Sequence, residues 1–242
     1  MAFSGFKPQA LRHCNSKPIS LITRRANVWL SRGLNASFAV GHMALGYFLG
    51  KPAAKLLKTR LNIPLVLVFS IIPDADILLG MKEFHRGPTH SVITAIVVFI
   101  PFFVIYRRKA VPYFLALISH SLIADFFIGG NIMLFWPLTS NLYGSWFYIS
   151  IWSITNVILE WTLFAISTII MFKTGDLRLF FQNRKSNLLL AIPIVTVLLP
   201  TFVSYPLRVP IVLMPPHLFY LVLFSVSVLI GLIGILKKGH RV

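Results

Sequence analysis

Long apolar runs separated by short polar or basic segments dominate the chain. Six of these runs have the length of a helix that crosses about 30 Å of hydrocarbon, or nearly so, at a rise of about 1.5 Å per residue. They lie near residues 61–80, 89–106, 111–128, 146–172, 186–205 and 217–236. A seventh run, 34–50, is short and contains three glycines, so it is either a tight span or a re-entrant helix. The pattern predicts an all-α fold, a polytopic transmembrane helical bundle of six spans plus this short seventh or re-entrant N-terminal segment.

Composition supports a membrane protein over a soluble one. Hydrophobic residues make up 57% of the 242 residues and charged residues 12%, against about 25% charged in a soluble domain. The connections are too short for a separate soluble domain. We expect a basic, disordered N-terminal arm at 1–33, a membrane-embedded domain at 34–145, and additional transmembrane helices of the same bundle at 146–242.

The net charge of +17 raises the question of nucleic acid binding, which the position of the charges argues against. The basic residues cluster between apolar runs, as in cytoplasmic loops that face anionic lipid. The clusters are Lys51, Lys55, Lys58 and Arg60; Arg107, Arg108 and Lys109; Lys173, Arg178, Arg184 and Lys185; Lys237, Lys238 and Arg241. The uncharged segment 129–145 is then external. We therefore expect membrane lipid, and no nucleic acid, as a partner.

Several ionisable residues lie within or beside the apolar runs, where a charge costs about 2.5–3.5 kcal/mol on insertion scales. They are His42, Asp74, Asp76, His85, His90, His120, Asp125 and Glu160. With the orientation above, three separate segments bring His and Asp side chains to one depth near the external face. The single cysteine, Cys14, excludes a thiolate site. Imidazole and carboxylate groups together suit zinc, manganese or iron, and zinc or manganese is favoured.

Simpler interpretations exist for individual residues. Asp74 and Asp76 could end a helix, and His42 alone could be a packed core histidine. Glu160 could pair with a buried donor. Arg86 could be an ordinary loop residue, although its external position favours an anion-binding role.

Four blocks of sequence resemble the YdjM-like family of integral membrane proteins, to which a metal-dependent hydrolase activity is ascribed. They are Gly41-His42, the IPDAD segment 72–76, the HRGPTHS segment 85–91, and Ser119-His120 through Asp125 to Phe135-Trp136-Pro137. Their order and approximate spacing match over about residues 36–140. The HRGPTHS block is the most specific of the four.

The sequence departs from that family in the fourth block. Three residues usually separate the His from the Asp, whereas four separate His120 from Asp125. In a regular helix the two side chains would be about 140° apart. A π-bulge would realign them, and such bulges are frequent at functional sites. Without one, His120 or Asp125 is not a ligand.

The resemblance implies a membrane-embedded metal-dependent hydrolase, which we expect to be a multi-pass protein of a prokaryotic cell membrane. The orientation inferred from the basic loops places its site toward the external face. A subset of six residues would hold one or two metals: His42, Asp74, Asp76, His90, His120 and Asp125. His85 could act as general acid or base, Arg86 could bind an anionic group, and Glu160 is a third catalytic candidate. We expect an amphiphilic or phosphorylated substrate. The alternatives are a metal-ion or proton transporter, and a non-catalytic protein with a structural or degenerate metal site.

Overall fold

The computed structural model of the chain describes residues 38–77, 85–147, 149–203 and 209–239. The chain divides into two units, Met1–Gly33 and Leu34–Val242. The predicted basic arm at 1–33 lies outside the described residues. The described residues all lie in the second unit.

Helices form in all seven apolar runs. The first half contains α2 (Ala39–Leu56), α3 (Ile63–Ile71) with its 3-10 extension η1 (Ile72–Ile77), η3 (Pro88–His90), α4 (Val92–Tyr106), η4 (Arg107–Lys109) and α5 (Val111–Ser119) with the π-helical η5 (His120–Asp125). The second half contains α6 (Ile154–Thr174), η6 (Asp176–Phe181), η7 (Lys185–Leu190), α7 (Ala191–Pro193), the π-helical η8 (Ile194–Leu198), α8 (Leu199–Val203), η9 (Ile211–Leu213) and α9 (Met214–Gly239). The described segments contain isolated bridges but no strand, which confirms the all-α prediction.

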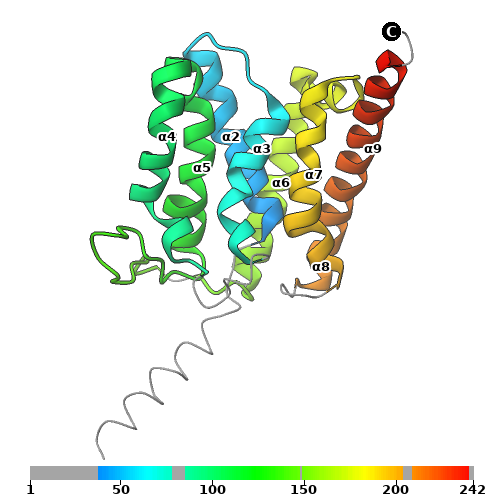
Figure 1. Cartoon of the computed structure of the whole chain (residues 1–242). Helices are drawn as coiled ribbons and strands as arrows, with labels where there is room; N and C mark the ends of the chain where they lie inside the picture. The colour runs from blue at the N-terminus through cyan, green and yellow to red at the C-terminus, as the bar shows by residue number, and fades with distance from the viewer. Residues whose placement is uncertain (1–37, 78–84, 148, 204–208, 240–242) are drawn as a thin grey trace, which may run out of the picture. The chain divides into compact units, whose positions relative to one another are not determined.

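Helix α2 is the central helix of this unit and packs against α3, α5 and α6 (Figure 1). Its glycines permit close approach. A Cβ atom at Gly46 would lie 2.4 Å from Cβ of Ser70 on α3, and one at Gly50 would lie 2.8 Å from Cγ2 of Val66. Small residues at such contacts are typical of helices that pack in membranes. The close contact between α2 and α3 places His42 beside the end of α3.

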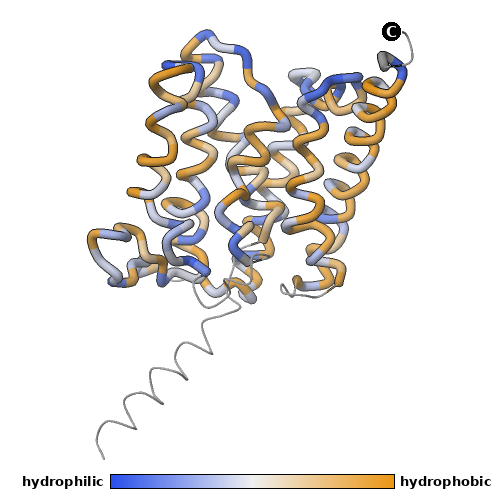
Figure 2. The backbone as a smooth tube through the Cα atoms, viewed as in Figure 1, coloured by the Kyte–Doolittle hydropathy of each residue, from blue (hydrophilic) through white to orange (hydrophobic). Residues whose placement is uncertain are grey.

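Within the described part of the chain, three helices are long and apolar enough to cross a membrane: Ile154–Thr174, Lys185–Val203 and Ile211–Lys237. Helix α4 and the combined α5–η5 helix are each 15 residues long, or about 22 Å at 1.5 Å per residue. The count of six spans therefore stays a prediction, as does the choice between a tight span and a re-entrant segment for α2. Apolar residues line most of the visible length of the helices (Figure 2).

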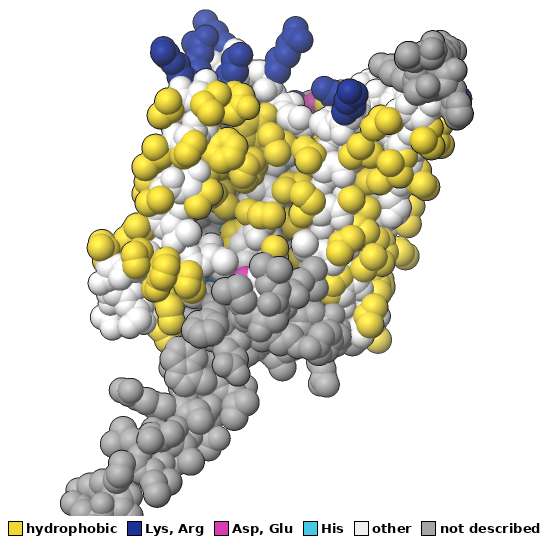
Figure 3. All heavy atoms as spheres, in the orientation of Figure 1, with side chains coloured by type: hydrophobic (Ala, Val, Ile, Leu, Met, Phe, Trp, Pro, Cys, Tyr) yellow, Lys and Arg dark blue, Asp and Glu magenta, His cyan; other side chains and the backbone are white. Residues whose placement is uncertain are grey.

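The two ends of the helices differ in charge. Lys and Arg side chains gather along the upper edge in Figure 3, where an acidic side chain is also visible, whereas His and further acidic side chains are visible lower down. We call the upper end, which carries Lys51, Arg60, the Arg107–Lys109 segment and Lys185, the basic end. The opposite end holds the start of α2 and the ends of η1 and η5, and we call it the His/Asp end.

Candidate metal centre

The last turn of the α5–η5 helix determines where two of the predicted ligands point. Residues His120–Asp125 form a π-helix, in which hydrogen bonds join residues five apart. The extra residue between His120 and Asp125 is accommodated in this wider turn, so both side chains lie on one face. His120 Nε2 is 3.4 Å from Asp125 Oδ2. Of the two alternatives that the spacing left open, the structure shows the π-bulge, which brings His120 and Asp125 onto one face.

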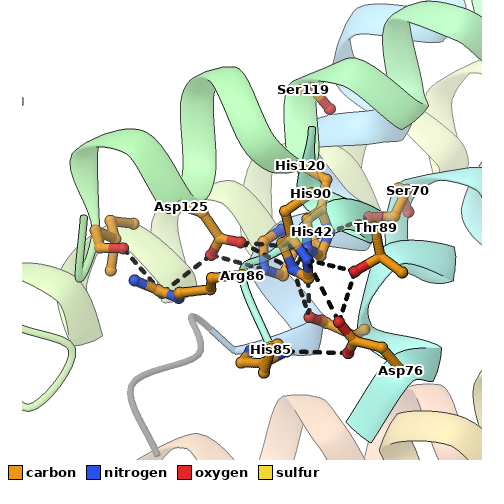
Figure 4. Close-up of polar contacts among 12 residues, drawn as sticks. His42, Ser70, Asp76, His85, Arg86, Thr89, His90, Ser119, His120 and Asp125 are labelled. Carbon is orange, nitrogen blue, oxygen red and sulfur yellow. Dashed lines mark hydrogen bonds and ion pairs between the residues drawn. The ribbon is translucent and has the colours of Figure 1, made fainter. Parts of the chain in front are cut away.

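Four side-chain atoms from three elements, η1, η3 and η5, converge at this turn (Figure 4). His90 Nε2 and His120 Nε2 are 3.1 Å apart. Asp74 Oδ1 lies 3.4 Å from the first and 3.3 Å from the second, and Asp125 Oδ2 lies 3.3 Å and 3.4 Å from them. Ligands about 2.0–2.1 Å from a tetrahedral zinc ion are about 3.3 Å from one another. These five separations fit edges of such a tetrahedron, so the two imidazole nitrogens together with either carboxylate oxygen are close enough to hold one metal ion.

Neighbouring groups fix which nitrogen of each imidazole carries the proton. His120 Nδ1 is 2.8 Å from the carbonyl oxygen of Ser70. A carbonyl only accepts, so Nδ1 donates and Nε2 keeps its lone pair. The hydroxyl of Thr89 donates to Asp76 Oδ2 at 2.6 Å and lies 3.0 Å from His90 Nδ1, which then donates to it. Both Nε2 lone pairs therefore face the four-atom cluster, as in metal sites whose histidines are oriented by a second group.

The charge of the site also favours a cation. Asp74, Asp76 and Asp125 are at most 2% exposed, and Arg86 is the buried cation that contacts one of them. With the imidazoles neutral, three carboxylates and one guanidinium leave two negative charges in excess. Buried charge is costly unless it is balanced. A divalent cation provides that balance, and oxygen and nitrogen ligands suit zinc or manganese.

The HRGPTHS block is one compact turn. His90 ends the short η3 helix, and Ser91 caps α4 by accepting hydrogen bonds from the backbone N–H groups of Ile93 and Thr94. His85 Nδ1 is 3.0 Å from Asp76 Oδ1, and its Nε2 makes no hydrogen bond among the described residues. His85, Asp74 and His90 each offer an atom within 4.8 Å of the other two. His85 is thus held by Asp76 at the edge of the four-atom cluster.

Arg86 binds protein groups with both terminal nitrogens. Its Nη2 donates to Asp125 Oδ1 at 3.1 Å and to the Ile128 carbonyl at 3.2 Å, and its Nη1 donates to the Gly130 carbonyl at 2.5 Å. A Cβ atom at Gly129 would lie 2.6 Å from Nη1, so a glycine is needed there. Asp125 therefore offers one oxygen to Arg86 and the other to the cluster. The Arg86 guanidinium therefore supports one candidate ligand, Asp125, and the backbone turn at Ile128–Gly130 that follows it.

Two further predicted residues meet at the start of α2. Glu160 of α6 is 2% exposed, and its Oε2 accepts a hydrogen bond of 2.6 Å from the backbone N–H of Gly41. The N-cap residue, Phe38, has no side-chain acceptor, so Glu160 replaces it at the positive end of the helix. His42 follows directly and stacks on His120, with ring centroids 3.9 Å apart.

The structure brings five of the six predicted ligands into groups that could hold a metal: His42, Asp74 and His120; Asp74, His85 and His90; and His90, His120 and Asp125. Asp76, the sixth, is in none of these groups and contacts His85 and Thr89 instead. His85 joins a group although it was predicted as an acid or base. Glu160 is in none of them, and its carboxylate pairs with a buried donor.

Sequence reasoning missed the groups that orient the histidines. The Ser70 carbonyl carries no signal in the sequence, because any residue type supplies it. Thr89 did carry one, since it lies inside the HRGPTHS block beside His90. A hydroxyl next to a candidate ligand is a natural candidate for its hydrogen-bond partner.

Comparison with known protein families identifies the family of this chain. The family model described as YdjM inner membrane protein matches residues 38–211, which is more than half of the chain and includes every predicted site residue. Neither the curated proteins nor the solved structures contain a match. The breadth of the family match, together with the apolar helices, shows that this chain is an integral membrane protein that belongs to the YdjM inner membrane protein family.

Proposed function

We propose that this protein is a membrane-embedded metal-dependent hydrolase. The observation that carries the proposal is the position of Asp74 Oδ1 and Asp125 Oδ2, each 3.3–3.4 Å from His90 Nε2 and His120 Nε2, which are 3.1 Å apart. These four residues are the ligands in our proposal. His42, stacked on His120, is a fifth candidate because it shares a group with Asp74 and His120.

A bound zinc or manganese ion would lower the pKa of a coordinated water toward neutrality and polarise the bond to be cleaved. His85 is the acid or base in the proposal. Because its Nδ1 faces a carboxylate of Asp76, that nitrogen carries a proton and Nε2 is left as an acceptor. A histidine oriented by a carboxylate in this way is suited to move a proton at its far nitrogen.

Asp76, Arg86 and Glu160 receive positioning roles. Asp76 holds His85 and, through Thr89, orients His90. Arg86 is occupied by Asp125 and two carbonyls, so we assign it to Asp125 rather than to an anionic substrate. Glu160 fixes the first turn of α2 and with it the backbone beside His42. The catalytic roles considered for Arg86 and Glu160 are thus replaced by support of the ligands.

The segment beside the site favours an amphiphilic substrate. The segment between η5 and α6 exposes Leu138, Trp146 and Phe147, which are 82%, 86% and 60% exposed. It is joined to the HRGPTHS block, because the Met133 N–H donates to the Arg86 carbonyl and Ser91 Oγ donates to the Trp136 carbonyl. Exposed aromatic residues typically lie at the level of lipid headgroups. A lipid-like phosphoester, with its polar group at that depth, is the substrate class that fits.

A transporter is less well supported. A pathway across the membrane needs polar groups at successive depths. The described acidic residue at the basic end is Asp176, and it is paired with Lys51 and Tyr47. The candidate ligands instead lie together at the His/Asp end. We therefore expect no ion flux in proteoliposomes.

Hydrolysis of phosphoesters by the purified protein tests the proposal. Reconstituted protein should hydrolyse one member of a panel of lipid phosphoesters, lose the activity on chelation, and regain it with zinc or manganese. His85→Gln should keep bound metal but lower turnover by about 100-fold or more, because a general acid or base contributes about 10²–10⁴-fold.

Asp176→Asn is the matched control for these assays. It removes a buried carboxylate from the basic end, far from the proposed ligands, and should leave hydrolysis unchanged. Metal-dependent ion flux with no hydrolysis of any panel member would overturn the proposal in favour of a transporter.

A further inference from the structure

A cavity of about 330 Å³ lies at the basic end, away from the His/Asp site. Helices α3, α4 and α5 form it, and its apolar wall consists of Leu65, Phe69, Phe99 and Phe102. The rings pack against one another, with centroids of Phe69 and Phe99 5.3 Å apart and those of Phe99 and Phe102 5.2 Å apart. The volume is within the range of about 300–1,000 Å³ typical of ligand pockets.

Arg60 and Lys109 also line the cavity. Both are exposed, and neither forms an ion pair within the part of the chain that the structure describes. Asn62 and Tyr113 of the cavity contact each other: the Asn62 N–H donates to the Tyr113 hydroxyl at 2.9 Å, and Asn62 Oδ1 accepts from the Leu65 N–H. Arg60 and Lys109 are therefore the groups of the cavity with which an anionic ligand can form ion pairs.

Among the described residues, no carboxylate lies beside these two cations. Asp74, Asp76, Asp125 and Glu160 belong to the His/Asp end, and Asp176 contacts Lys51. An exposed Phe102 (38%) and Tyr106 (53%) place one side of the cavity at the outer surface of the helices. A ligand with an apolar chain and a negative headgroup would satisfy both parts of the cavity.

We infer that this cavity binds one anionic phospholipid, with an acyl chain among the phenylalanines and the phosphate at Arg60 and Lys109. An acyl chain gains little from leaving other lipid tails, because both surroundings are apolar. A preference for one phospholipid over another must therefore come from the headgroup. Basic residues at the cytoplasmic membrane surface attract anionic lipids, and a guanidinium is well suited to phosphate.

Photoreactive lipids test the inference on the full-length protein in nanodiscs. Phosphatidylglycerol and phosphatidylcholine probes with the same diazirine-bearing acyl chain are compared, and the crosslinked peptides are identified by mass spectrometry. The phosphatidylglycerol probe should be captured preferentially, with crosslinks on Phe69, Phe99 or Phe102. Arg60→Gln with Lys109→Gln should lower that preference by about tenfold or more, since each basic residue near the surface contributes roughly fivefold.

The matched control is Lys173→Gln with Arg178→Gln. This pair makes the same change in charge at exposed positions near the basic end, on α6 and η6, and should keep the preference. Leu65→Trp, which adds bulk to the partly exposed rim of the cavity, should move crosslinks away from Phe69 while the charges remain. Equal capture of both lipids, or an equal loss in both double variants, would overturn the inference.

Discussion

Thr89 joins a candidate metal ligand to a carboxylate. Its hydroxyl lies 3.0 Å from His90 Nδ1 and 2.6 Å from Asp76 Oδ2. Thr89→Val keeps the shape of the side chain but removes this link. We expect metal affinity to fall by about 10–100-fold, the usual effect of losing a group that orients a ligand. Titration of the metal-free protein with zinc measures it.

Thr94→Val is the control for Thr89→Val. Thr94 lies one turn into α4, and its hydroxyl makes no hydrogen bond among the described residues. Zinc affinity should stay at the level of the unchanged protein. Equal zinc affinity in both variants would show that Thr89 does not orient His90.

Gly41 lets Glu160 reach the first turn of α2. A Cβ atom at this position would lie 2.5 Å from Glu160 Oε1. Gly41→Ala should therefore destabilise the protein by about 1–3 kcal/mol, as overpacking of a buried contact does. Thermal unfolding in detergent measures the change.

Shortening Glu160 separates this collision from other effects of the alanine. In the Gly41→Ala background, Glu160→Asp should recover part of the lost stability, because the carboxylate withdraws. Two residues in contact are expected to couple in such a cycle. Strictly additive losses from the two substitutions would contradict a direct contact.

At the residue scale the sequence predicted which side chains gather but not what each does. Charged and imidazole groups in apolar runs are costly, so their positions alone indicated the site. Roles depend on distances that no spacing encodes. Asp76 was one of six residues of which a subset was expected to bind metal. In the structure it contacts His85 and Thr89, and Arg86 faces Asp125 and two carbonyls. Separate segments supply these partners, so only the fold could show them.

The π-helix His120–Asp125 is the element on which the candidate site depends most. Deletion of Ile123, which is 42% exposed, would leave three residues between His120 and the following Asp. A regular α-helix then places both side chains on one face, since i and i+4 are neighbours. We expect this variant to retain its bound metal, as measured by elemental analysis.

Deletion of Leu115 is the matched control. It also removes one residue from the same helix, but ahead of the π-turn, and rotates the residues before it by about 100° relative to those after it. Metal should be lost or strongly reduced. The contrary result is that the Ile123 deletion loses its metal although gel filtration shows a folded protein, while the Leu115 deletion keeps its metal. That result would show that the π-turn does more than realign two ligands.

At the scale of elements, the prediction was accurate where the length of an apolar run determines whether a helix forms. Every long apolar run contains a helix, because burial of backbone polar groups in lipid requires one. Boundaries were less accurate. The run at 146–172 begins its helix only at Ile154, since Ser153 provides the N-cap, and Pro73 lies in a 3-10 rather than an α-helical turn. These ends depend on caps and prolines, whose influence is local.

On the scale of the whole molecule, the charge difference between the two ends predicts the orientation. The basic end should face the cytoplasm and the His/Asp end the outside. In a Cys14→Ser background, an impermeant maleimide should label Trp146→Cys on intact cells, because this position is 86% exposed at the His/Asp end. Arg108→Cys should be labelled only after permeabilisation. Labelling of Arg108→Cys alone on intact cells would reverse the orientation.

The central claim is that one divalent metal binds among Asp74, His90, His120 and Asp125. Elemental analysis of the purified full-length protein, loaded with zinc and passed through a desalting column, tests it most directly. We predict about one zinc ion per chain in the unchanged protein and in Asp176→Asn, and close to none in His120→Gln and Asp125→Asn, since each proposed tetrahedral site then lacks a ligand. An equal zinc content in all four proteins, or none in the unchanged protein, would contradict the claim.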